Sequence, residues 1–307
     1  MKFTLKQLAY FVAAGEAGSI LKAADMIHVS QPSISNAISH LEDVFQVQLF
    51  IRHHAKGMSL TTAGVQIMER AKQLLRDADE LKSFAGLLSD RIYGSINIGC
   101  FIPLAPIITP ELCHGFIKAH QHVDLSVCED DQAGLLSRLK RGSVDLVLTY
   151  NLQLDRDIRF IPLVELEPYV LLSADHAMAK QKKINLSDLD QEPFILLDLP
   201  LSDTYFMSLF SAAGLKPRIY ARTRHIEVQR GLVANGYGFS LANVRPVNQF
   251  SLDGHALVYV PMSGNNKGLT LGIASLQQQK TTRVVEKFTQ YCQEQISQDN
   301  IPGMAFL

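Results

Sequence analysis

The sequence predicts an α/β protein in three parts: a helical N-terminal domain over residues 1–60, a long helix over residues 61–90 and a C-terminal domain over residues 91–307. Three observations lead to this prediction. Apolar residues recur at helical spacing through the first part, a seven-residue apolar repeat follows, and from Gly94 onward β-branched runs alternate with helical patterns. Strands that alternate with helices are typical of a parallel α/β architecture.

The composition is that of an ordinary globular protein, with 47% hydrophobic and 19% charged residues. The net charge of −1 gives the whole molecule no electrostatic attraction to nucleic acid or membranes. No run of about 18 apolar residues is present, so no membrane span is predicted. The N-terminal residues carry apolar side chains at helical spacing, so we expect an amphipathic helix rather than a secretory signal, and a cytoplasmic protein.

The four cysteines, Cys100, Cys113, Cys128 and Cys292, form no CxxC pair and no cluster with histidines. We therefore expect buried thiols that behave as small hydrophobic groups, with no metal and no cofactor. One alternative stays open. Cys100 precedes a predicted helix N-terminus, where a thiolate is stabilised, so it is the candidate for a redox-sensing thiol.

Motifs of enzymes are missing from the sequence. It has no glycine-rich phosphate loop, no GxSxG elbow and no metal-binding helix motif. No catalytic residue is therefore assigned, and the protein is not expected to be an enzyme.

The segment GSILKAADMIHVSQPSIS predicts a helix, a short turn and a second helix. Ser19 is placed to cap the first helix, and His28 and Val29 make the turn. Ser30 is placed to cap the second helix, with Pro32 in its first turn, where a missing N–H costs nothing.

The second of these helices has two different faces. Ile34, Ile38, Leu41 and Phe45 follow helical spacing and predict a buried stripe, which leaves Gln31, Ser35, Asn36, Ser39 and His40 facing outward. Amide and hydroxyl side chains can hydrogen-bond base edges in the major groove, and a helix pair with a short turn is a DNA-binding geometry. A solvated face in a plain helical domain explains the same residues, and the net charge of +1 over residues 1–58 does not decide between the two.

The run QVQLFIRHHAKGMSLTTAG predicts a strand, a turn and a strand, then a helix capped by Thr61 or Thr62. The tip of this hairpin carries basic side chains that can contact phosphates or a minor groove: Arg52, His53, His54 and Lys56. The adjacent histidines would point in opposite directions on an extended chain, so no metal site is expected there.

The long helix carries a heptad repeat. Ile67, Leu74, Leu81 and Leu88 recur every seven residues, with alanines at the alternate seam position: Ala71, Ala78 and Ala85. This narrow stripe predicts a dimer through residues 67–88, and packing against the chain's own N-terminal domain is the alternative.

An ordered set of short motifs, AGS, KAAD, HVSQPSIS, LE, LFIR and LTTAG, resembles the N-terminal domain of LysR-type transcriptional regulators. The resemblance extends in architecture over the whole chain. It implies a winged helix-turn-helix, a linker helix and a two-lobed effector-binding domain similar to periplasmic binding proteins. The function it implies is sequence-specific DNA binding, or DNA bending, modulated by a small-molecule effector.

The resemblance also implies partners and roles. Promoter DNA, further copies of the chain in a dimer and then a homotetramer, and RNA polymerase are the expected macromolecular partners, with no membrane. Gln31, Pro32, Ser35 and Asn36 would lie at the major groove, Ser30 and Ser33 at phosphates, and Arg52 in the wing at the minor groove. One departure is visible: many members have a glycine between recognition helix and wing, where this chain has Phe45-Gln46, which leaves the helix end open.

The C-terminal domain is expected to contain lobe I over about 91–162 and 266–307, and lobe II over about 163–265. Ligands of such sheets bind beyond the carboxyl ends of strands, near helix N-termini. The candidate effector residues are therefore Cys100, Phe101, Pro103, Tyr150, Asn151, Asp198, Pro200, Ser202, Thr223, Arg224 and His225.

An amino acid or a related carboxylate is the expected effector, because Arg224 and His225 could hold a carboxylate and Asp198 an amine. Arg224 could instead pair with Glu227, and Tyr150 and Phe101 could be core aromatics. Two alternative functions also stay open: redox sensing through Cys100, and a two-lobed solute-binding module without a DNA function.

Overall fold

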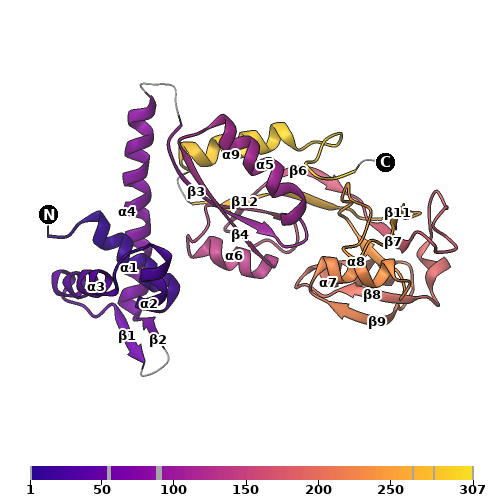
Figure 1. The fold of residues 1–307 in the computed structure, drawn as a ribbon, viewed down its shortest axis with the longest axis horizontal. Coiled ribbons are helices and arrows are strands. Elements are labelled where there is room, and N and C mark those ends of the chain that lie inside the picture. The colour runs from indigo at the N-terminus through magenta and orange to yellow at the C-terminus, as the bar shows by residue number, and fades with distance from the viewer. Residues whose placement is uncertain (1, 54–56, 88–91, 265, 279–280, 306–307) are drawn as a thin grey trace. The chain divides into compact units, whose positions relative to one another are not determined.

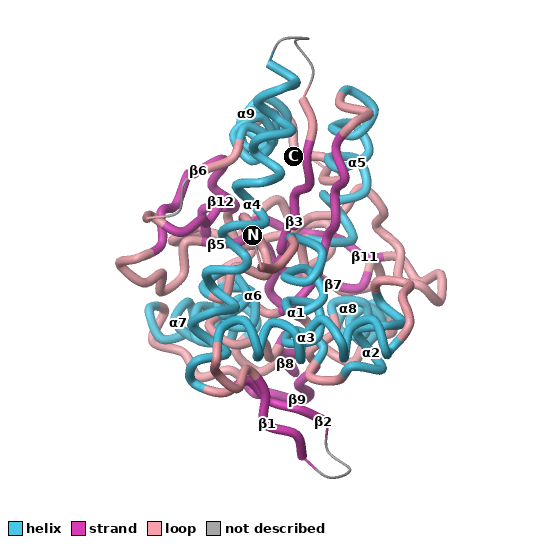
Figure 2. The backbone as a smooth tube through the Cα atoms, turned by 90° about the vertical axis from the view of Figure 1, so that its left-hand side faces the viewer, coloured by secondary structure: helices cyan, strands magenta, loops and turns pink. Residues whose placement is uncertain are grey.

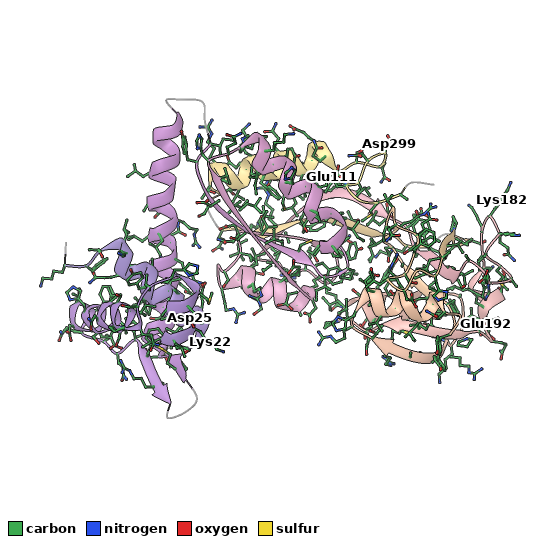
Figure 3. All side chains as sticks on the ribbon, in the orientation of Figure 1. Lys22, Asp25, Glu111, Lys182, Glu192 and Asp299 are labelled. Carbon is green, nitrogen blue, oxygen red and sulfur yellow. The ribbon has the colours of Figure 1, made fainter. Side chains whose placement is uncertain are left out.

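The computed structural model describes residues 2–53, 57–87, 92–264, 266–278 and 281–305. The chain divides into two units, Met1–Gly94 and Ser95–Leu307 (Figure 1). Charged side chains stand on the outside of each, such as Lys22 and Asp25 in the first and Lys182 in the second (Figure 3). Within the described ranges, every helix is too short or too polar to pass through a bilayer.

The N-terminal unit packs short helices against one long helix. Its elements are α1 (Leu5–Ala17), α2 (Ile20–Met26), α3 (Gln31–Phe45), β1 (Phe50–His53), β2 (Gly57–Leu60) and α4 (Thr62–Leu87). β1 and β2 pair antiparallel and project away from α1 and α3 (Figures 1 and 2). The predicted helix-turn-helix and wing are therefore confirmed.

Local signals start these helices where the sequence predicts. Ser19 Oγ accepts a hydrogen bond from Lys22 N at the start of α2, at 3.4 Å. His28 adopts φ 53° in the turn before α3. Thr61, rather than Thr62, caps α4, because its Oγ1 accepts from Gly64 N at 2.8 Å.

The predicted stripe of α3 forms the core of the unit. Ile34, Ile38 and Leu41 are at most 1% exposed and pack with Phe11 of α1. Phe45 is half-buried at the end of the stripe. This packing turns the opposite side of α3 to solvent.

The heptad stripe of α4 has two environments. Ile67 and Ala71 pack on the core of their own unit, whereas Leu74 and Leu81 are 45% and 70% exposed. The side chain of Ala85, and Leu88 altogether, lie outside the described residues. The start of the stripe therefore packs against the chain's own domain, whereas Leu74 and Leu81 in its middle are exposed to solvent.

Gln46 ends α3 in the left-handed region, with φ 55° and ψ 35°. This conformation costs a residue with a Cβ about 1–2 kcal/mol, and a hydrogen bond from Gln46 Nε2 to Asp43 O, at 2.6 Å, offsets part of that cost. The helix end that the sequence left open is therefore a position suited to glycine.

Replacing Gln46 with glycine is expected to raise the unfolding free energy of the N-terminal unit by about 0.5–1 kcal/mol, because glycine removes the Cβ strain. Hydrogen exchange of the α1 and α3 amides measures the change. Gln66→Gly, on the exposed side of α4, is the control. It should lower the unfolding free energy of the unit by about 0.5–1 kcal/mol, because Gln66 has no strain to relieve. Equal losses in both variants would contradict the strain argument.

The C-terminal unit contains a five-stranded sheet in the order β4-β3-β5-β12-β6. The strands are β3 (Gly94–Phe101), β4 (Val123–Asp130), β5 (Leu146–Tyr150), β6 (Ile158–Leu166) and β12 (Leu269–Leu276). Figure 1 shows α5 (Ala105–Ala119) and α9 (Arg283–Gln295) on one face and α6 (Gln132–Lys140) on the other. β3 and β5 are parallel, but β12 runs antiparallel to β5 and β6, so the expected parallel architecture is a mixed sheet.

Two smaller sheets make up the second lobe of this unit. One has the order β10-β7-β11 and the other pairs β8 with β9. Their strands and helices are β7 (Tyr169–Ser173), β8 (Pro193–Leu197), β9 (Arg218–Thr223), β10 (Ser240–Ala242), β11 (Leu257–Pro261), α7 (Ser202–Ala212), α8 (Ile226–Ala234) and a 3-10 turn, η1 (Leu186–Leu189).

The chain leaves the five-stranded sheet later than the expected boundary near Pro162. β6 continues through Pro162 to Leu166 and pairs with β12 along its length. Proline is tolerated because β6 is the edge strand and the register shifts opposite it, between Leu271 and Gly272. Pro162 therefore lies within an edge strand and not at the end of the first lobe.

Candidate functional site

The outward face of α3 is the first candidate site. Gln31, Asn36, Ser39 and His40 are exposed and Ser35 is half-buried. His40 Nε2 lies 2.8 Å from Lys2 O, so this ring holds the N-terminal residues. The amide and hydroxyl groups nearer the start of α3 remain available to a partner.

Ser30 occupies the N-cap position of α3, but its side chain makes no capping bond to a backbone N–H. Its hydroxyl instead lies 2.8 Å from the hydroxyl of Ser33. The predicted capping bond is therefore wrong, and both hydroxyls are exposed beside the first turn of α3.

The wing carries the second set of predicted DNA-contacting residues. Arg52 lies on β1 opposite Met58 of β2, and its side chain is exposed. Lys56 and His54 lie outside the described residues. Of the two wing residues predicted to contact DNA, Arg52 and Lys56, the structure therefore describes only Arg52.

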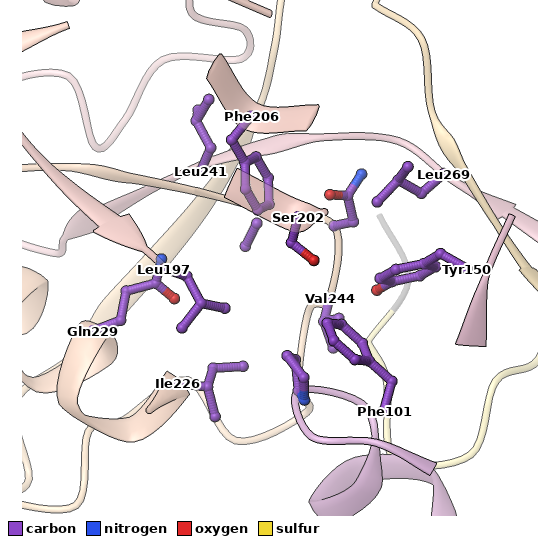
Figure 4. Close-up of a pocket in the computed structure, with 13 residues that line it drawn as sticks. Phe101, Tyr150, Leu197, Ser202, Phe206, Ile226, Gln229, Leu241, Val244 and Leu269 are labelled. Atoms are coloured by element: carbon purple, nitrogen blue, oxygen red, sulfur yellow. The ribbon is translucent and has the colours of Figure 1, made fainter. Parts of the chain in front are cut away.

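A cavity of about 30 Å³ lies between the lobes of the C-terminal unit, and thirteen residues line it (Figure 4). The five-stranded sheet supplies Phe101 at the end of β3, Pro103 in the turn after it, Tyr150 at the end of β5 and Leu269 at the start of β12. The second lobe supplies Leu197, Ser202, Phe206, Ile226, Gln229, Leu241, Ala242, Asn243 and Val244. We call this space the interlobe cavity.

Three buried oxygen atoms of the lining have no hydrogen-bond partner: Tyr150 Oη, Ser202 Oγ and Asn243 Oδ1. Burial also raises the pKa of the Tyr150 hydroxyl far above its usual value, so the group stays neutral. Figure 4 shows the hydroxyls of Ser202 and Tyr150 pointing into the cavity. Unpaired buried polar groups are rare and costly, so they indicate a missing partner such as a ligand or water.

The residue before Ser202 has a strained backbone. Leu201 adopts φ 71° at the start of α7, a conformation that a bulky residue with a Cβ seldom takes. Such strain persists only where the surroundings enforce it, and it clusters at binding sites. Here the strained turn places Ser202 in the cavity wall.

Four of the predicted effector residues line the cavity, namely Phe101, Pro103, Tyr150 and Ser202, and the others have different roles. Asn151 Oδ1 accepts a hydrogen bond from Thr270 N at 3.1 Å and so joins β5 to β12. Pro200 is exposed outside the lining. Cys100 is fully buried in the core of the sheet.

The charged candidates are also outside the lining. Arg224 Nη2 contacts Asp131 Oδ2 at 2.7 Å, and not Glu227 as the sequence suggested. Asp198 pairs with Arg222 at 3.3 Å. Thr223 and His225 bond each other through Thr223 Oγ1 and His225 N, at 3.1 Å, in the loop before α8.

Sequence reasoning missed nine lining residues: Leu197, Phe206, Ile226, Gln229, Leu241, Ala242, Asn243, Val244 and Leu269. The most informative of these is Asn243, which follows β10. Its Nδ2 donates to Leu166 O at 2.9 Å and to Tyr205 Oη at 3.0 Å. A polar residue directly after a predicted strand was the signal that could have found it.

The thiols do not have the environment that redox sensing through Cys100 requires. Burial raises the pKa of Cys100 well above its usual value and that of Cys113 to about 11. Burial also raises the pKa of Cys128 and of Cys292. The expected stabilisation of a Cys100 thiolate by a helix N-terminus is therefore wrong, because loss of hydration outweighs it.

Peroxide is expected to leave DNA binding unchanged. At pH 7.4, a thiol with the pKa of Cys113, about 11, is ionised in fewer than about one molecule in a thousand, and only the thiolate reacts. Mass spectrometry after peroxide treatment checks this, with urea-unfolded protein as the control that should oxidise. The prediction would be contradicted if peroxide weakened DNA binding by the wild type but not by the Cys100→Ser variant.

Two family profiles and a solved structure match most of this chain. The profile of the bacterial regulatory helix-turn-helix protein, lysR family, matches residues 5–65, and that of the LysR substrate binding domain matches residues 89–297. HinK, a LysR family transcriptional regulator from Pseudomonas aeruginosa, aligns with a TM-score of 0.66 at 38% identity, covering 96% of this chain and 99% of that chain.

Two further relatives are transcriptional regulators. YybE of Bacillus subtilis is 26% identical, over 93% of this chain and 97% of that protein. OxyR of Escherichia coli, a DNA-binding transcriptional dual regulator, is 28% identical over 88% of each chain. With its helix-turn-helix, wing and two-lobed domain, this chain belongs to the LysR family of DNA-binding transcriptional regulators with an effector-binding domain.

Proposed function

We propose that α3 enters the major groove of specific promoter sites and that a small molecule in the interlobe cavity modulates this binding. The observation that carries the first half is the exposed amide and hydroxyl face at the start of α3. Gln31 and Asn36 can each form two hydrogen bonds to adenine, and Ser35 can bond a base edge. Pro32, beside them in the first turn, would lie against the groove floor.

The remaining contacts in this proposal go to the DNA backbone. Ser30 and Ser33 would bond phosphates at the start of α3, and Arg52 with Lys56 would bring the wing to the minor groove. A net charge of +1 over residues 1–58 gives one copy few phosphate contacts. Affinity would therefore depend on several copies that bind one DNA together.

Assembly through α4 would supply those copies. Leu74 and Leu81 leave an apolar stripe uncovered beyond the part of α4 that packs on its own unit. We propose a dimer through residues 67–88 and a homotetramer of two such dimers. RNA polymerase is the further partner that a promoter-bound tetramer would meet.

Replacing Asn36 with alanine is expected to weaken binding to the specific site by about 1–3 kcal/mol, because two hydrogen bonds to a base edge are lost. The site is first selected from genomic fragments with competitor DNA at fixed salt. Titration of wild type and variant against the selected site and random DNA then measures the change. Equal losses of affinity on both DNAs would show that Asn36 does not contact bases. If selection enriches no site, the proposal that α3 binds specific promoter sites is overturned.

The second half of the proposal concerns the two lobes. Arg224, before α8, pairs with Asp131, which caps α6 on the five-stranded sheet. Asn243 bonds Leu166 O at the end of β6, where the chain crosses between the lobes. A ligand in the interlobe cavity would contact both lobes and stabilise the closed arrangement, which shifts the population of conformations that bind DNA.

The amino acid or carboxylate expected from the sequence depended on Arg224, His225 and Asp198. Arg224 and Asp198 are engaged in ion pairs, and none of the three lines the cavity. These three residues therefore offer no counter-charge to a ligand in the cavity.

A further inference from the structure

We infer that the ligand of the interlobe cavity is an uncharged molecule with an apolar body and at least one N–H or O–H donor. This inference rests on the proposed function of the cavity as the effector site. It is argued from the cavity walls, from their unpaired polar atoms and from the charges nearby.

The walls are apolar and carry no formal charge. Among the described residues that line the cavity, aliphatic and aromatic side chains dominate, and none is Asp, Glu, Lys, Arg or His. The rings of Phe101 and Tyr150 meet edge to face with centroids 5.5 Å apart, and Phe206 faces them from α7 (Figure 4). Such walls favour an apolar body, because its burial removes hydrocarbon surface from water.

The unpaired polar atoms define where the ligand must be polar. Tyr150, Ser202 and Asn243 are at most 4% exposed, and each has an oxygen without a partner. The amide nitrogen of Asn243 is already bonded to Leu166 O and Tyr205 Oη, so its free atom is the carbonyl oxygen, which only accepts. The ligand must therefore donate to Asn243 Oδ1.

The two hydroxyls are less restrictive. Ser202 Oγ and Tyr150 Oη can each donate or accept, so a ligand carbonyl or hydroxyl can satisfy either one. Gln229, the remaining polar residue of the lining, already donates its Nε2 to Ser240 Oγ. A primary amide, an alcohol or a phenol has the donor and acceptor set that the three free oxygens require.

Arg224 and Asp198, the charged groups that the sequence offered to a carboxylate and an amine, are already paired. Arg224 contacts Asp131 at 2.7 Å and Arg222 contacts Asp198 at 3.3 Å, and none of the four lines the cavity. A carboxylate or ammonium in the cavity would lose its hydration without gaining a counter-charge. That cost corresponds to a Kd at least about 100-fold weaker than that of an uncharged molecule of the same shape.

The experiment compares molecules of one shape and different charge on the full-length protein. The probes are 2-methylpropanamide, 2-methylpropanoate and 2-methylpropylammonium, with the larger set 2-phenylacetamide, phenylacetate and 2-phenylethylammonium. Each probe is larger than the cavity of about 30 Å³, so its binding requires the two lobes to move apart. Calorimetric titration gives each Kd, and DNA binding is measured in the same samples. An amide is expected to bind at least about 100-fold more tightly than the two ions of its set.

Two variants locate the probe. Tyr150→Phe and Ser202→Ala each remove an oxygen that has no protein partner, so both variants are expected to fold as stably as the wild type. Each should weaken amide binding by about tenfold, the worth of one hydrogen bond. Thr109→Val, outside the cavity on α5, is the control and should leave the Kd unchanged.

The outcomes separate the inference from the proposed function. Tighter binding of an ion than of its amide, sensitive to both variants, would overturn the uncharged ligand and leave the cavity as the effector site. Absence of binding by both amides, or binding that neither variant changes, would also overturn the inference. Amide binding in the cavity that leaves DNA affinity unchanged would support the ligand class and contradict the proposed modulation.

Discussion

Replacing Arg230 with methionine is expected to lower the unfolding free energy of the C-terminal unit by about 3–5 kcal/mol, because three hydrogen bonds from a charged donor are lost and each contributes about 1.5–3 kcal/mol before the cost of burying the guanidinium is subtracted. Arg230 lies on α8 with 2% of its surface exposed. Its guanidinium donates to Asn248 O at 2.9 Å, to Phe250 O at 2.8 Å and to the hydroxyl of Tyr259. Methionine fills similar space but leaves these acceptors without a donor.

The loss has a local signature as well. Phe250 belongs to a loop whose apolar side chains are turned to solvent, with Val247 65% and Leu252 84% exposed. Few apolar contacts can hold such a loop, so the bonds from Arg230 fix its path. Hydrogen exchange by mass spectrometry should therefore show faster exchange over residues 246–255 than in wild type.

Arg222→Met is the matched control for this change. Arg222 pairs with Asp198 at 3.3 Å, but its side chain is 53% exposed, so the pair contributes about 0–1 kcal/mol. Urea unfolding followed by circular dichroism compares the two variants with wild type. Equal stability of Arg230→Met and Arg222→Met would mean that the buried network contributes little to the fold.

Most of the N-terminal unit could be predicted because its signals are local. The apolar spacing of Ile34, Ile38 and Leu41 fixes which face of α3 is buried, and Ser19 caps α2 with a backbone three residues away. Periodicity and caps depend on neighbours along the chain, so the sequence contains them directly. The capping bond expected from Ser30 fails for a local reason also, because Ser33 offers its hydroxyl a competing partner.

The interlobe cavity was harder to predict because distant segments build it. Arg224 pairs with Asp131, 93 residues earlier, rather than with Glu227 on its own helix. Cys100 and Phe101 are the last two residues of β3, and side chains alternate between the two faces of a strand, so the Cys100 thiol points into the core while Phe101 lines the cavity. Strand ends located the region of the site, and which side chains enter it depended on the tertiary fold.

Gly64→Ala is expected to lower the unfolding free energy of the N-terminal unit by about 1–3 kcal/mol, although alanine is the better helix former. Gly64 lies in the first turn of α4, where an added Cβ would stand 2.1 Å from Leu49 O, closer than any real contact. The same carbonyl accepts the hydrogen bond from Thr61 N at 3.0 Å. Backbone must therefore move, and α4 would separate from the segment that leads into the wing.

Gly231→Ala on α8 should change stability in the opposite direction. A Cβ at Gly231 meets no atom within 4 Å, so alanine there gains about 0.5–1 kcal/mol from helix propensity alone. Thermal unfolding of both variants, with hydrogen exchange to assign the change to a unit, measures the two signs. A gain in both would show that the close approach of α4 to Leu49 relaxes freely, whereas opposite signs mean that backbone packing, and not helix propensity, requires the glycine of the LTTAG motif.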